Sequence, residues 1–126
     1  MTELSMFLRF CLVGGLGFVV DAGCTLAFTQ LLGWPPGLSR VLAFALAAST
    51  TWFCNRSFTF RSAAGASTWL PYVLLTAFGA VLNLGVYMAW LAVFGTSATD
   101  IFLGVVFGSA AALALNYAIS RRYVFA

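Results

Sequence analysis

The sequence predicts an all-α membrane protein with four transmembrane helices, and composition, hydropathy and the spacing of apolar runs all lead to this fold class. Hydrophobic residues make up 63% of the 126 residues and charged residues only 7%, whereas a soluble domain carries roughly 25% charged residues. The mean hydropathy is +1.02, and four apolar runs reach the length of about 20 residues that crosses a bilayer. A chain of this length forms one domain, residues 1–126.

Turn-forming segments separate the four runs. Gly33-Trp34-Pro35-Pro36-Gly37 ends the first helix with turn formers and an interfacial tryptophan. Small residues at 62–68 form a linker before the third helix, and a polar turn at 95–100 precedes the fourth. Pro71 is acceptable because it lies in the first turn of the third helix. We therefore expect helices at about residues 6–32, 38–60, 69–94 and 101–122.

The arginines predict the orientation of the helices. With four spans, five of the six arginines fall on one side of the membrane, whereas the other side carries only Arg40 and Asp100. Basic residues concentrate in cytoplasmic segments of membrane proteins. The chain is therefore expected to be a multi-pass protein of the cytoplasmic (inner) membrane with both termini in the cytoplasm.

The two halves of the chain also resemble each other. A shift of 62 residues places Gly17 on Gly79 and Asp21 on Asn83, and a shift of 65 places Arg56 on Arg121 and Phe60 on Phe125. Because both helix pairs run in the same direction, the halves would be parallel repeats about an axis along the membrane normal. The predicted repeats cover about residues 1–61 and 68–126.

Three polar residues lie within the predicted spans. A carboxylate at Asp21 costs about 2.5–3.5 kcal/mol in a bilayer, so this side chain should face the bundle interior, protonated, hydrogen-bonded or paired with an arginine. Its functional interpretation is an acceptor for a ligand hydroxyl or a proton-coupling site. The structural alternative is a hydrogen bond between helices, to Asn83 or Asn116. The amides of Asn83 and Asn116 suit sugar hydroxyls, and they equally suit helix association.

Basic residues at the helix ends form the second candidate site. A guanidinium group matches the oxygens of a phosphate, and arginines at interfacial depth lie where lipid phosphates occur. The alternative is that they are ordinary topology anchors, as we expect for Arg61. Trp52 and Tyr117 could stack on a bound ligand, or belong to the interfacial belt and helix packing. The candidate phosphate-binding residues are Arg9, Asn55, Arg56, Arg121 and Arg122.

The order of these motifs resembles the GtrA-like family over nearly the whole chain. The motifs are Arg9-Phe10 leading into Val13-Gly14-Gly15, the intramembrane Asp21, the block Asn55–Phe60 and the tail Asn116–Phe125. That family is associated with cell-surface polysaccharide synthesis and glycan modification. The resemblance implies a flippase for polyprenyl-phosphate-linked sugars, with a membrane glycosyltransferase as the partner that loads the lipid carrier.

The residues favour no enzyme. The sequence has no histidine, no acid pair at hydrolytic spacing and no nucleophile with its base, so we expect neither catalysis nor a metal or other cofactor. The net charge of +3 reflects the orientation of the chain in the membrane and does not indicate binding to nucleic acid. Two other functions remain, a small multidrug-type exporter and a non-transporting scaffold for a glycosyltransferase. Because four helices enclose little space, we expect a homo-oligomer or a groove open to membrane lipids.

Overall fold

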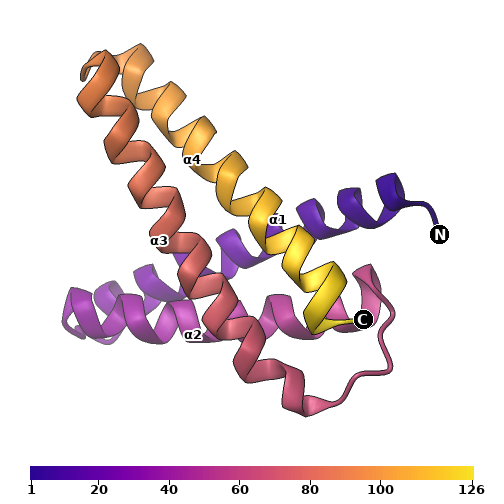
Figure 1. Cartoon of the computed structure of the whole chain (residues 1–126). Coiled ribbons are helices and arrows are strands. Elements are labelled where there is room, and N and C mark those ends of the chain that lie inside the picture. The colour runs from indigo at the N-terminus through magenta and orange to yellow at the C-terminus, as the bar shows by residue number, and fades with distance from the viewer.

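The computed structural model describes residues 1–126 and consists of helices and connecting loops. Two antiparallel helical hairpins cross each other, one formed by α1 and α2 and the other by α3 and α4 (Figure 1). All four helices are long and apolar enough to cross a membrane. The predicted all-helical membrane fold is therefore confirmed. The helices are α1 Glu3–Leu26, α2 Pro36–Cys54, α3 Trp69–Phe94 and α4 Ala98–Ile119.

Two helices begin three residues earlier than expected, because polar residues at their starts act as helix caps. The Thr2 hydroxyl accepts a hydrogen bond from the Ser5 amide at 3.1 Å, so α1 begins at Glu3 and not at residue 6. Ser97 and Asp100 form a reciprocal capping box, so α4 begins at Ala98 and not at residue 101. Such caps satisfy the free amides of a first helical turn with residues that resemble a polar turn in sequence.

Three helices end in a wider π-helical turn of five residues. These turns follow α1, α2 and α4 directly, at Ala27–Leu31, Asn55–Thr59 and Ser120–Val124. A π turn changes the direction of the side chains that follow it, and such turns are frequent at functional sites. The turn after α2 buries both Asn55 and Thr59, and the turn after α4 buries Ser120 and Val124. The second and fourth transmembrane segments thus end with the same local geometry.

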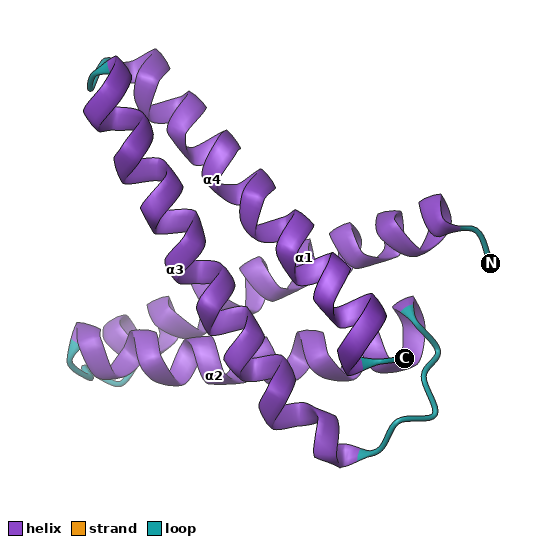
Figure 2. Ribbon diagram, in the orientation of Figure 1, coloured by secondary structure: helices purple, strands orange, loops and turns teal.

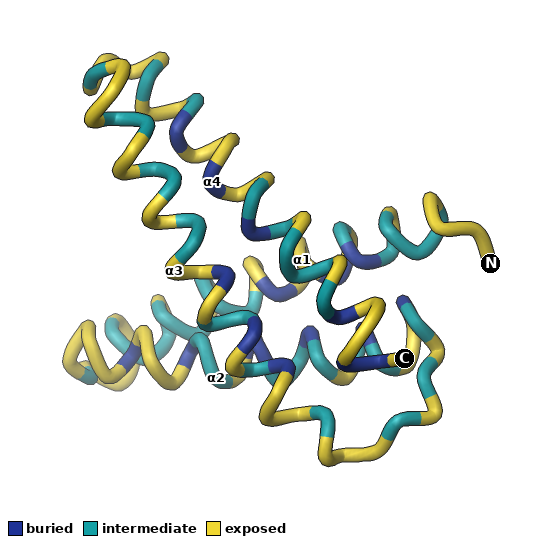
Figure 3. Tube along the Cα trace, viewed as in Figure 1, coloured by how far each residue is buried: buried dark blue, intermediate teal, exposed yellow.

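Small residues bring the two helices of each hairpin close together. A Cβ atom on Gly17 of α1 would collide with Thr51 of α2, and one on Gly108 of α4 would collide with Asn83 of α3. Buried positions are concentrated along the inner faces, and the outer faces are exposed (Figure 3). Close contact between small residues is a main source of helix association in a bilayer, where lipid tails are as apolar as leucine.

The two ends of the molecule differ. The N-terminus, the C-terminus and the α2–α3 linker lie at one end, called the terminal end (Figures 1 and 2). The turns of the two hairpins lie at the opposite end, called the turn end, where the hairpins diverge. The hydrophobic core joins the hairpins near the terminal end. It contains Tyr72, Leu75, Val124 and Phe125, with Trp52, Phe60 and Ile119 packed against it.

The buried positions of the two hairpins correspond under the shifts found in the sequence. Each buried residue of α1 lies 62 positions before a buried residue of α3, in the pairs Phe10 and Tyr72, Val13 and Leu75, and Gly17 and Gly79. The shift of 65 likewise relates Ser39, Ala43 and Ala47 of α2 to Gly104, Gly108 and Ala112 of α4. Parallel repeats would produce this agreement, and duplication of the chain stays a prediction.

The close approach of α3 and α4 yields a first prediction. Gly108→Ala should destabilise the fold by about 1–3 kcal/mol, since the added Cβ would lie 2.6 Å from the backbone oxygen of Asn83. Unfolding in a detergent titration measures this change. Gly85→Ala is the matched control, because a Cβ at Gly85 meets no atom within 4 Å. Equal stability of the two variants would contradict the proposed close packing.

Candidate functional site

The most prominent cavity lies between the two hairpins and has a volume of about 340 Å³. All four helices line it, and its walls combine small and apolar residues with a set of polar side chains. Asp21, Asn83 and Asn116, which the sequence analysis placed within the membrane, all belong to its lining. The further polar residues of the wall are Thr51, Asn55, Tyr72 and Thr76.

A buried hydrogen-bond chain forms the terminal end of this cavity. The Tyr72 hydroxyl donates to the Thr51 hydroxyl at 2.9 Å and accepts from the Asn55 side-chain amide at 2.9 Å. The amide oxygen of Asn55 accepts a hydrogen bond of 2.7 Å from the hydroxyl of Thr59, the last residue of the same π turn. Asn55 is only 1% exposed and Tyr72 only 4%. The predicted phosphate ligand Asn55 thus lies in the interior and connects α2 to α3.

Asp21 is paired with an arginine, but not with one of the cluster near the termini. Its two carboxylate oxygens each lie 3.3 Å from Nη1 of Arg40, in the first turns of α2. Of the three states expected for this carboxylate, protonated, hydrogen-bonded or paired with an arginine, the structure has the ion pair. The pair connects the two helices of the first hairpin. It offsets part of the cost of placing a carboxylate among apolar segments.

The two intramembrane asparagines each press against a glycine of the opposite helix. Asn83 of α3 packs on Gly108, and Asn116 of α4 packs on Gly79. The Oδ1 atom of Asn116 is buried and has no hydrogen-bond partner in the protein. An unsatisfied buried carbonyl is costly, and it is the kind of acceptor that a ligand hydroxyl can satisfy. Asn116 therefore stands out among the cavity residues as a candidate ligand-binding group.

The candidate phosphate-binding arginines have local partners, and none lines the cavity. Arg9 donates to the Phe58 carbonyl oxygen at 3.1 Å and lies over the Phe58 ring. Arg56 donates from Nε to the carbonyl oxygen of Ala64 in the linker and lies over the Trp52 ring. These contacts tie the first hairpin and the linker together at the terminal end.

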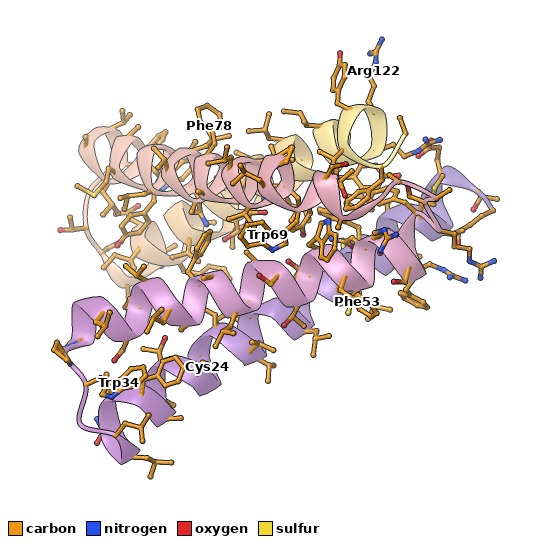
Figure 4. The ribbon with its side chains drawn as sticks, turned by 90° about the horizontal axis from the view of Figure 1, so that it is seen from below. Cys24, Trp34, Phe53, Trp69, Phe78 and Arg122 are labelled. Atoms are coloured by element: carbon orange, nitrogen blue, oxygen red, sulfur yellow. The ribbon has the colours of Figure 1, made fainter.

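The remaining two arginines follow α4. Arg121 forms a 2.6 Å ion pair with Glu3, which also accepts a 2.6 Å hydrogen bond from the Tyr117 hydroxyl. This contact joins the first residue of α1 to the end of α4. Arg122 lies over the Tyr123 ring and points away from the helices (Figure 4). The structure thus gathers these arginines at one end but distributes them among separate contacts.

The two candidate stacking residues both take part in packing. The Trp52 indole donates to the Thr68 hydroxyl at 3.0 Å. The Tyr117 ring makes edge contacts with Phe7 and Phe10. Neither residue lines the cavity. A ligand could reach these rings only outside the cavity.

Three residues at the site, Thr51, Tyr72 and Arg40, were not among those that the sequence predicted. Tyr72 corresponds to Phe10 under the 62-residue shift, so its extra hydroxyl was the available signal of a polar role. Thr51 looked like one of many hydroxyls that bond their own helix. Arg40 was read only as a residue of the less basic side. No group of three or more His, Cys, Asp or Glu side chains is arranged to hold a metal ion.

The Tyr72 hydroxyl yields a second prediction. Tyr72→Phe should destabilise the fold by about 1–2 kcal/mol, because the buried Asn55 amide loses its acceptor. Detergent unfolding measures the effect, and Tyr123→Phe is the control because Tyr123 is 72% exposed. If the two variants unfold alike, the hydrogen-bond chain does not hold the hairpins together.

Comparison with known families agrees with this architecture. Residues 9–125 match the family model described as GtrA/DPMS, transmembrane domain. The match covers most of the chain, includes all four helices apart from the first six residues of α1, and confirms the predicted GtrA-like resemblance. It links the protein to a membrane function that involves polyprenyl-phosphate sugars. The chain is a multi-pass membrane protein and belongs to the GtrA/DPMS transmembrane-domain family.

Proposed function

We propose that the protein is a flippase that moves a polyprenyl-phosphate-linked sugar across the cytoplasmic membrane for cell-surface polysaccharide synthesis or glycan modification. The observation that carries this proposal is the cavity between the hairpins, which combines Asp21, Asn83 and Asn116 within the membrane-spanning part of the molecule. A sugar head group needs such a polar path because its hydroxyls cannot be left unpaired in the hydrocarbon.

The size and chemistry of the cavity support a sugar as the transported group. Its volume of about 340 Å³ lies at the lower end of the range for ligand sites. Amide and hydroxyl groups line it beside apolar surface, a combination that suits the mixed faces of a sugar ring. The Oδ1 atom of Asn116 has no partner in the protein and would accept a bond from a sugar hydroxyl when the side chain turns from Gly79 into the cavity.

The arginines support entry of the phosphate at the terminal end. Arg9, Arg56, Arg121 and Arg122 surround this end, which the positive-inside rule assigns to the cytoplasm. Their guanidinium groups would attract the lipid phosphate while the sugar enters the cavity. The prenyl chain would stay in the bilayer against the exposed apolar faces of the helices. A membrane glycosyltransferase is the proposed source of the loaded lipid.

The Asp21–Arg40 pair weakens the case for a cation exporter. An exporter of the small multidrug type would need a carboxylate available to a cationic substrate. In this structure both carboxylate oxygens of Asp21 face the Arg40 guanidinium. An arginine so close to the cavity wall favours an anionic substrate instead.

Transport in reconstituted liposomes tests the proposal. The liposomes contain a labelled polyprenyl-phosphate sugar, and appearance of the head group on the opposite leaflet is followed with and without protein. We expect the folded protein to accelerate this exchange. If it does not, yet raises the activity of a co-reconstituted glycosyltransferase, the scaffold function replaces the flippase.

The free acceptor in the cavity yields a third prediction. Asn116→Leu should lower the exchange rate about tenfold or more, because a similar-sized apolar group cannot bond a sugar hydroxyl. Gln30→Leu also replaces an amide but lies in the π turn after α1, outside the cavity, and should leave the rate unchanged. Equal rates in the two variants would remove Asn116 from the transport path.

The arginines at the terminal end yield a fourth prediction. Arg56→Ala should raise the half-saturating concentration of the lipid substrate several-fold, as expected when a charge-assisted contact to phosphate is lost. Arg61→Ala removes the same charge close by in the chain and serves as the control. The measurement is the exchange rate as a function of substrate content. A matching effect of both substitutions would indicate general surface charge and not a phosphate site.

A further inference from the structure

Arg40 is the one basic residue near the turn end of the molecule. The other five arginines lie in the first part of α1, after α2 or after α4, all toward the terminal end. The Arg40 side chain is 61% exposed, whereas its partner Asp21 is 24% exposed. A substrate that leaves the cavity toward the turn end therefore meets a single accessible guanidinium.

The contact between Arg40 and Asp21 leaves most of the guanidinium unused. Only Nη1 approaches the carboxylate, at 3.3 Å from each oxygen, and Nε and Nη2 have no hydrogen-bond acceptor in the protein. A paired guanidinium normally forms two parallel hydrogen bonds of about 2.7–2.9 Å. The long, single-nitrogen contact and the free donors leave room for a second anion beside Asp21.

The second hairpin has no ion pair at the positions that correspond to Asp21 and Arg40. Asn83 and Val105 stand at the positions that the shifts of 62 and 65 relate to Asp21 and Arg40. Both line an open recess of about 280 Å³ on that hairpin. The second hairpin therefore has no arginine at the position that corresponds to Arg40. Arg40 sits next to the cavity because its partner Asp21 is part of the cavity wall.

From this geometry we infer that Arg40 is a binding site for the phosphate of the lipid-linked substrate at the turn end, with Asp21 as the competing internal anion. The inference rests on the proposed function and adds the residue that receives the head group after it has crossed. The free Nε and Nη2 donors bind the phosphate. The Asp21 carboxylate competes for Arg40 and so limits its affinity for the phosphate. When Asp21 pairs with Arg40 again, the phosphate is released.

Binding of a model lipid phosphate tests this site by the sign of two effects. The probe is farnesyl phosphate, added to the full-length protein in detergent micelles, with affinity followed by tryptophan fluorescence. Arg40→Gln should weaken binding about tenfold or more, through loss of a charge-assisted hydrogen bond. Asp21→Asn should strengthen it, because the competing charge is gone. Arg40→Lys should keep part of the affinity, since it retains the charge without the planar fork.

Opposite effects of the two substitutions separate a binding site from a structural ion pair. If the ion pair only holds α1 against α2, Arg40→Gln and Asp21→Asn should both weaken binding. That result would overturn the inference. Asp100→Asn is the control for charge, because it removes a carboxylate from the turn end in the other hairpin. It should leave the affinity unchanged. If Asp100→Asn raised the affinity as much as Asp21→Asn, specific competition between Asp21 and the phosphate for Arg40 would be ruled out.

Two further arms identify the ligand and keep this inference distinct from the proposed function. Inorganic phosphate should bind more weakly than farnesyl phosphate, and equal binding would overturn a lipid head group as the ligand. Binding with opposite signs but no transport by the wild-type protein would support the Arg40 site and refute the flippase. Transport by the wild type and by Arg40→Gln at equal rates would overturn the role of Arg40 in receiving the substrate.

Discussion

The hydrogen-bond chain through the Tyr72 hydroxyl is the contact on which the arrangement of the two hairpins depends. Helices in a bilayer gain little from burying apolar surface against one another, so polar contacts and close packing of small residues decide how they associate. Tyr72, in the hydrophobic core near the terminal end, connects α3 to Thr51 of α2 and to Asn55 of the π turn that follows α2. Because the hairpins are joined there and diverge beyond it, a cavity with polar walls can exist between them.

The cavity and the arginines divide two tasks between different parts of the molecule. The neutral amides and hydroxyls that suit a sugar lie between the hairpins. The cationic groups that suit a phosphate lie at the ends, with five arginines toward the terminal end and Arg40 near the turn end. A charged head group carried on a lipid needs both, since its sugar must cross the interior while its phosphate keeps a favourable partner.

Much of the fold could be predicted because hydropathy and length directly reflect the bilayer. The errors occurred at the capped ends of α1 and α4, where Thr2, Ser97 and Asp100 look like loop residues although they stabilise helices. Asp21 was expected to face the bundle interior, and Asn83 and Asn116 to bind sugar hydroxyls or to hold helices together; all three line the cavity. Asn55 was grouped with the arginines because it precedes Arg56, but the π turn directs it inward.

The sequence by itself determined the class of protein, the number of spans and the small and polar faces of the helices, since each follows from local composition and helical period. Only the tertiary structure decided which of these faces meet. It paired Asp21 with Arg40, joined Asn55 to Tyr72 and separated the arginines into individual contacts. These pairings depend on the angle and depth at which two hairpins cross, a relation between distant segments that no local pattern contains.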